Sequence, residues 1–127
     1  MNSSLTGAIC CAFGIAFGAF GTHSLEGKLP THQIEWWSTA TDYLWYNGLG
    51  LLTIGAHAHS REVLDWVSRL LFTGIALFCG SLYIYALTGH RLFGMITPIG
   101  GLMLLLAWTK ACWQFATKKE SRAREER

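Results

Sequence analysis

Apolar residues in this chain fall into four blocks that short polar links separate. The longest block follows Arg69 and contains nineteen residues without a charge, a proline or an asparagine. A helix of that length can cross the hydrocarbon core of a bilayer, which is about 30 Å thick. The segment 67–88 is therefore expected to be a membrane helix, which makes the chain a membrane protein.

The other three blocks are shorter or contain more small residues. The segment 5–22 has no basic residues before it and several glycines within it, so it is expected to be a mature membrane helix and not a cleaved signal peptide. The sixteen residues 43–58 would span only about 24 Å, so this helix must borrow length from residues 39–42. In the last block Pro98 suits the first position of a helix, with Thr97 as its cap.

The polar connection 23–42 predicts one more element. Gly27 and Pro30 interrupt any helix, and Thr31 can cap a new one. The pair Trp36–Trp37 has the amphipathic character that headgroup regions favour, although tryptophans can also bind a substrate. We expect a short interfacial helix that bends into the second membrane helix or continues directly as that helix.

These elements define the expected fold class. We predict an all-α membrane protein, a four-transmembrane-helix bundle over residues 1–117 with a short interfacial helix between helices 1 and 2. A charged tail on the cytoplasmic side, residues 118–127, follows this single domain.

Small residues recur at helical spacing inside the blocks. In the first block residues 7, 11, 14, 18 and 21 form one stripe, which would let a second backbone approach closely. The alternative is a narrow permeation groove lined by glycine. The residues expected to pack helices together are Gly14, Gly18, Gly21, Gly74, Gly80, Ser81, Gly100 and Gly101.

The basic residues predict an orientation. With four spans both termini share a side, and seven of the ten Lys and Arg residues lie on that side, against Lys28 and Arg91 on the other. The positive-inside rule then places the N and C termini on the cytoplasmic or matrix side of a bacterial or mitochondrial inner membrane. The basic tail suits anionic membrane lipids, and no nucleic-acid partner is expected.

Few polar side chains lie inside the expected spans. Asn47 should face the bundle, where it either forms an interhelical hydrogen bond or contacts a ligand together with Tyr43. Lys110 can extend to the headgroups, or it can belong to a proton or anion path. No Asp or Glu is expected within a span and no catalytic set is evident, so we expect neither an enzyme nor a cofactor.

Cysteines and histidines offer little chemistry. Cys10, Cys11, Cys79 and Cys112 lie in apolar blocks without a C-x-x-C pair, which is typical of buried packing residues. His23, His32 and His90 are expected on the outer side, where they could bind a transition metal if the loops converge. Histidines at an interface are more often bystanders, and no metal site is predicted.

Three motifs in this order resemble a known family. GIAFGAFGTHSL at 14–25, LFCGSLYIYALTG at 77–89 and ITPIGGLMLLLAW at 96–108 are similar to the family catalogued as domain of unknown function 423, which includes transmembrane protein 256 and the bacterial YgdD and YwdK inner-membrane proteins. The resemblance implies a small four-helix integral membrane protein and brings no established activity. The chain departs from the family's Y-Q-x-x-H pattern, because Asn47 follows Tyr43 where that pattern has histidine.

Two functions remain open from the residues alone. The first is a non-enzymatic accessory or assembly subunit whose small-residue faces pack against a larger membrane complex or a second copy. The alternative is a small transporter or ligand-binding protein for a lipid, a quinone or a small solute. Its site would lie between the second and fourth helices, near Asn47, Tyr43 and Lys110.

Overall fold

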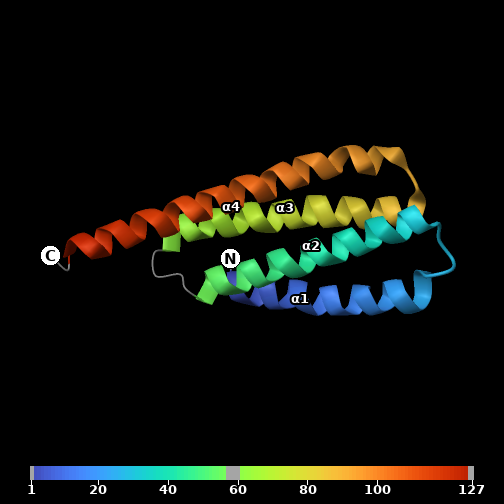
Figure 1. The fold of residues 1–127 in the computed structure, drawn as a ribbon, viewed down its shortest axis with the longest axis horizontal. Coiled ribbons are helices and arrows are strands. Elements are labelled where there is room, and N and C mark those ends of the chain that lie inside the picture. The colour runs from blue at the N-terminus through green and yellow to red at the C-terminus, as the bar shows by residue number, and fades with distance from the viewer. Residues whose placement is uncertain (1, 57–60, 126–127) are drawn as a thin grey trace.

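The computed structural model describes residues 2–56 and 61–125, which form four α-helices and one π-helical turn. In chain order they are α1 (Ser3–Phe20), the π-turn η1 (Gly21–Leu25), α2 (Thr31–Ala56), α3 (Arg61–Thr88) and α4 (Arg91–Glu125). Figure 1 shows the helices running antiparallel in sequence, with both ends of the chain at the same end of the bundle. The main interfaces are α1 with α2, α2 with α3, and α3 with α4. The protein is therefore all-helical, with α2 and α3 at its centre.

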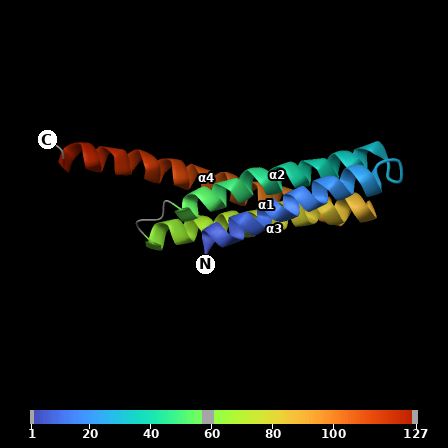
Figure 2. The same ribbon diagram turned by 90° about the horizontal axis from the view of Figure 1, so that it is seen from below.

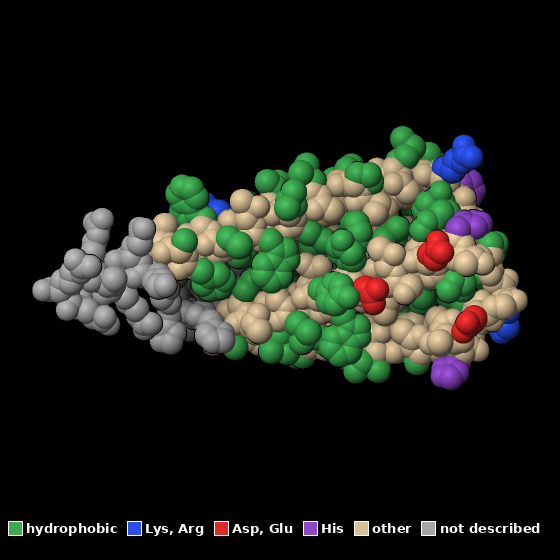
Figure 3. Space-filling model, viewed as in Figure 1, with side chains coloured by type: hydrophobic (Ala, Val, Ile, Leu, Met, Phe, Trp, Pro, Cys, Tyr) green, Lys and Arg blue, Asp and Glu red, His purple; other side chains and the backbone are tan. Residues whose placement is uncertain are grey.

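Three segments among the described residues are long and apolar enough to cross a membrane. They are Ser3–Leu25, Asp65–Thr88 and Arg91–Thr117, whereas α2 is not among them. Large apolar side chains lie exposed along α1 and α4, including Phe13, Leu102 and Leu105, and much of the visible surface is hydrophobic (Figure 3). Such a surface is typical of contact with lipid.

The separate interfacial helix does not form, because α2 runs unbroken from Thr31 to Ala56 and takes in both tryptophans. Trp37 is buried, and its indole Nε1 donates a hydrogen bond to the Phe17 carbonyl at 2.8 Å. The Trp36 ring stacks on Tyr85 with centroids 3.8 Å apart. These contacts hold the first turns of α2 on the bundle, so the direct continuation of the two expected helices is the arrangement found.

The expected start of the last helix at Pro98 is wrong. α4 begins at Arg91 and contains Pro98 in its interior. Thr97 does not cap it; its hydroxyl lies 2.8 Å from the Ser81 hydroxyl and 3.3 Å from the Phe93 carbonyl, to which it donates. A proline removes one intrahelical hydrogen bond, and α4 packs on α3 on both sides of it, at Gly94 against Tyr85 and at Gly100 against Phe78. α4 also continues through residues 118–125, so much of the expected tail is helical.

Glycines bring the helices close together, but not all of those expected. A Cβ at Gly14 would collide with the Trp45 ring, and one at Gly21 would collide with the Trp37 ring. On the other side of the bundle, Gly74 faces Leu104 and Gly100 faces the backbone of Phe78. The face of α1 that carries the small residues therefore packs against α2 of the same chain.

Three other expected packing residues differ from this pattern. A Cβ at Gly18 or Gly101 would make only ordinary contacts, at 3.7 Å to Thr41 and 3.5 Å to the Phe78 ring. At Gly80 an added Cβ would meet no atom of the described residues within 4 Å, so the close helix approach expected there is not found.

Candidate functional site

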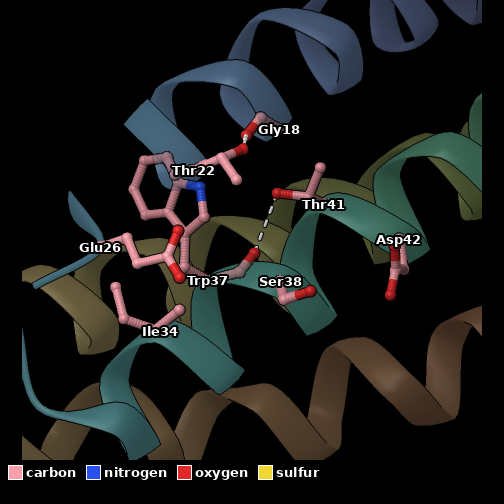
Figure 4. A pocket seen from close by; sticks show the side chains of 9 residues that line it. Gly18, Thr22, Glu26, Ile34, Trp37, Ser38, Thr41 and Asp42 are labelled. Carbon is pink, nitrogen blue, oxygen red and sulfur yellow. Dashed lines mark hydrogen bonds between the residues drawn. The ribbon is translucent and has the colours of Figure 1, made fainter. Parts of the chain in front are cut away.

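Several hollows among the described residues have a wall on α2, and two of them lie on different faces of that helix. The first, which we call the aromatic groove, lies between α2 and α4 and has a volume of about 480 Å³. It is lined by Tyr43, Tyr46, Asn47, Phe78, Gly101, Leu104, Leu105 and Trp108. The second, which we call the acidic cleft, lies between α2 and the end of α1 with η1 and has a volume of about 290 Å³ (Figure 4). It is lined by Gly18, Gly21, Thr22, Glu26, Ile34, Trp37, Ser38, Thr41 and Asp42.

Asn47 connects the two walls of the aromatic groove. Its side chain is only 4% exposed, and its Oδ1 accepts a hydrogen bond from the Trp108 indole Nε1 at 2.8 Å. Its Nδ2 donates to the Tyr43 carbonyl one turn earlier, also at 2.8 Å. Because an amide nitrogen carries two hydrogens, the second can serve another acceptor. The interhelical hydrogen bond that was one interpretation of Asn47 is therefore present, and a donor remains.

Aromatic rings form most of the remaining lining. The Tyr43 ring lies 4.6 Å from Phe78 and 6.4 Å from Tyr46, measured between centroids. Trp108 can reach the backbone of α2 because the position opposite its ring is Gly50, where a Cβ would lie 2.5 Å from the indole. Both tyrosines are exposed, so the groove opens onto the surface of the chain.

The structure brings together two of the three residues predicted for a ligand. Tyr43 and Asn47 both line the aromatic groove, but Lys110 does not. Lys110 follows Trp108 by two positions, which on a helix is a rotation of about 200°. Its side chain is exposed and points away from the groove, so the expected three-residue site is reduced to two.

The acidic cleft was missed by the sequence analysis. Figure 4 shows Glu26 beside the Trp37 indole at one end of the cleft and Asp42 at the other end, beyond Ser38 and Thr41. Asp42 was expected at the edge of a span, whereas it lies in the middle of an unbroken α2. The helical spacing of Ile34, Ser38 and Asp42 would have placed them on one face if α2 had been taken as continuous from Thr31.

Two of the three hydroxyl groups that line the cleft donate hydrogen bonds to backbone carbonyls. Thr22 donates to the Gly18 carbonyl at 2.7 Å, and Thr41 donates to the Trp37 carbonyl at 2.9 Å (Figure 4). The Thr41 oxygen also lies 3.1 Å from the Tyr83 hydroxyl. Both threonine hydroxyl hydrogens are therefore used within the chain, and only the remaining lone pairs of the oxygens can accept from a ligand.

The three outer histidines do not form a metal site. His23 lies in η1, His32 packs edge-on against Trp36 at 4.9 Å, and His90 precedes α4. Histidine side chains lie at one end of the bundle (Figure 3), but across residues 2–56 and 61–125 no three His, Cys, Asp or Glu side chains are placed to hold an ion. The three histidines therefore come from three different elements: η1, the first turn of α2 and the link before α4.

Comparison with known proteins finds relatives along most of the chain. Residues 17–101 match a family described as "Protein of unknown function (DUF423)". UPF0382 membrane protein SSP2132 of Staphylococcus saprophyticus is 46% identical over 105 residues, which cover 82% of this chain and 88% of the relative. SH2409 of Staphylococcus haemolyticus, with the same description, is 45% identical over 82% of this chain and 86% of its own length. YwdK of Bacillus subtilis is 38% identical over 82% of this chain and 87% of its own length. No solved structure matches the chain.

Proposed function

This chain belongs to the DUF423 family, whose relatives named above are described as membrane proteins, and we propose for it a ligand-binding role in the lipid phase. The protein is a non-enzymatic bundle of four spans that takes up an amphipathic, ring-bearing molecule in the aromatic groove. The observation that carries the proposal is the groove itself: about 480 Å³ of aromatic-walled space into which a buried amide opens. Ligand pockets in proteins commonly combine an apolar wall with a few polar groups at this scale.

The topology with four spans is supported by the position of α2. Its 26 residues correspond to about 39 Å, and it packs along both α1 and α3. Four crossings put both termini on one side, where the excess of basic residues favours the cytoplasmic face of a bacterial inner membrane. In this placement the mouth of the aromatic groove faces lipid, which gives a lipid-phase ligand direct access.

The lining of the groove indicates the chemical class of the ligand. Rings stack favourably on tyrosine, phenylalanine and tryptophan. The second Asn47 amide hydrogen and the tyrosine hydroxyls can donate to carbonyl oxygens. A planar ring with carbonyl groups and an apolar tail, as in a quinone, satisfies both the walls and the donors.

The test is quinone binding by the full chain in lipid nanodiscs. Asn47→Leu removes the amide, and Gly101→Leu fills the groove with a side chain. Both changes should lower the affinity for a short-tailed quinone at least tenfold. Gly80→Leu is the matched control, because it adds the same side chain where a Cβ meets nothing. Quinone binding by both groove variants at the wild-type affinity would contradict the proposal.

A second candidate function is an accessory or assembly subunit. It is favoured by the length of α4, whose 35 residues correspond to about 52 Å, well beyond the 30 Å or so of a bilayer core. Figures 1 and 2 both show its C-terminal part extending past the other helices. The glycine faces of α1 are filled within the chain, so a partner or a second copy would use the apolar outer face of α4 instead.

Purification in mild detergent tests this second function. The full chain should elute with a co-purifying membrane protein or as an oligomer. A lone monomer would count against the accessory role and leave quinone binding untouched.

A further inference from the structure

Asp42 lies level with the interior of the α1 span. Its neighbour Thr41 packs beside Gly18 of α1, where a Cβ would lie 3.7 Å from the threonine methyl. Gly18 precedes the end of that span at Leu25 by seven residues, or about 10 Å along the helix. A carboxylate at such a depth is costly unless it is paired, and acids inside membrane spans usually mark binding or transport sites.

No cation from the described chain neutralises the acidic cleft. Neither Lys nor Arg is among its lining residues, which include both Glu26 and Asp42. The Trp37 indole N–H is already committed to the Phe17 carbonyl, and the Thr22 and Thr41 hydroxyl hydrogens point to backbone carbonyls. The cleft therefore offers two carboxylates, acceptor oxygens and an aromatic wall, with Ser38 the one lining hydroxyl not committed in this way.

We propose that the acidic cleft binds an alkylammonium cation. The ammonium group lies at Asp42 and donates to the carboxylate and to the neighbouring hydroxyl oxygens. Its hydrocarbon part packs on Ile34 and Trp37, which line the cleft. Glu26 follows η1 toward the polar end of the bundle and draws cations to the entrance. The volume of about 290 Å³ admits a small amine, which can be a free hydrophobic amine or the amine of a lipid headgroup.

This site is separate from the aromatic groove. The two hollows share no lining residue and lie on different faces of α2. Loss of quinone binding would therefore leave amine binding intact, and the two proposals can fail independently.

The test uses the full chain in phosphatidylcholine nanodiscs and a fluorinated probe. 4-(Trifluoromethyl)benzylammonium is titrated and followed by ¹⁹F NMR, with 4-(trifluoromethyl)benzyl alcohol as the uncharged probe of the same shape. Wild type should bind the amine and bind the alcohol at least tenfold more weakly. Asp42→Asn should lower amine affinity at least tenfold, and Asp42→Glu should restore it to within about threefold.

Glu35→Gln is the matched control, because Glu35 is an acid of α2 outside the cleft. It should bind the amine like wild type, and circular dichroism should show equal helix content for all variants. Competition by added phosphatidylethanolamine would identify a lipid amine as a ligand, and its absence would identify free amines; either result supports an ammonium site. Equal binding of the amine and the alcohol, or full amine binding by folded Asp42→Asn, would overturn the proposal.

Discussion

The two sides of α2 differ in chemistry although they are adjacent in sequence. Asp42 lines the acidic cleft and Tyr43, the next residue, lines the aromatic groove. Successive residues on a helix point about 100° apart, so one helix can serve two unrelated surfaces. α2 is not apolar enough to be a candidate span, yet it carries the polar residues of both hollows. The more apolar helices beside it form the opposite walls.

The two sides also differ in how α2 meets its neighbours. Toward α1, the Cβ of an alanine at Gly55 would collide with the backbone of Ser4, and one at Gly7 of α1 would collide with the backbone of α2. Toward α4, Gly50 meets only the ring of Trp108. A ring can shift, whereas a backbone held by helical hydrogen bonds cannot. The α1 side should therefore be rigid and the α4 side adaptable.

The largest effect is expected for Gly7→Ala. The added methyl would meet the Leu52 amide nitrogen and the Gly48 carbonyl oxygen, so α1 and α2 must separate. Overpacking of this kind costs about 3 kcal/mol or less in most proteins, and we expect a value near that limit. Unfolding of the full chain in mixed SDS micelles, followed by circular dichroism, measures it. A change below 1 kcal/mol or so would show that the interface is not rigid.

A smaller effect is expected for Gly50→Ala on the opposite side. The methyl displaces the Trp108 ring, which moves at a cost of about 1–2 kcal/mol but loses its hydrogen bond to Asn47. Quinone affinity should fall while amine affinity stays the same. The same unfolding and binding assays apply. A loss of stability as large as that of Gly7→Ala would remove the contrast between the two sides.

The hydrogen bond between Trp108 and Asn47 should contribute modestly. Trp108→Phe removes the donor and keeps a ring, and interhelical hydrogen bonds in membrane proteins average about 0.6 kcal/mol. A double-mutant cycle with Asn47→Leu isolates that coupling from the packing change. A coupling energy of zero would mean that the bond does not join α2 and α4.

The smallest effect is expected for Gly18→Ala, on the same face of α1 as Gly7. Its methyl meets only Thr41 at 3.7 Å, and alanine favours a helix over glycine, so stability should change by about 0.5 kcal/mol or less. The methyl enters the acidic cleft and should weaken amine binding severalfold. Strong destabilisation would instead show that the cleft is closed by packing.

The sequence predicts the helical blocks well and their limits less well. The four apolar blocks predict four spans, of which three are long and apolar enough to cross a membrane, and glycines at helical spacing indicate the face of α1 that meets α2. The sequence does not predict that α4 begins before Pro98 or that α2 is continuous from Thr31. Both depend on contacts between residues that are distant in sequence. Ser81 with Thr97 and Trp36 with Tyr85 are such contacts.

The candidate site shows the same limit. Asn47 could be identified because a lone amide in an apolar helix must find a partner. Its actual partner, Trp108, and the empty side of Gly80 depend on how the helices rotate against one another. Asp42 was overlooked because a span was assumed to begin after it.

The most direct test of the account is a crossover between the two hollows. Quinone and alkylammonium binding are measured side by side in nanodiscs for Asn47→Leu and Asp42→Asn. The account predicts that Asn47→Leu loses the quinone and keeps the amine, while Asp42→Asn keeps the quinone and loses the amine. Loss of both ligands by either folded variant, or of neither by both, would contradict two independent sites on one helix.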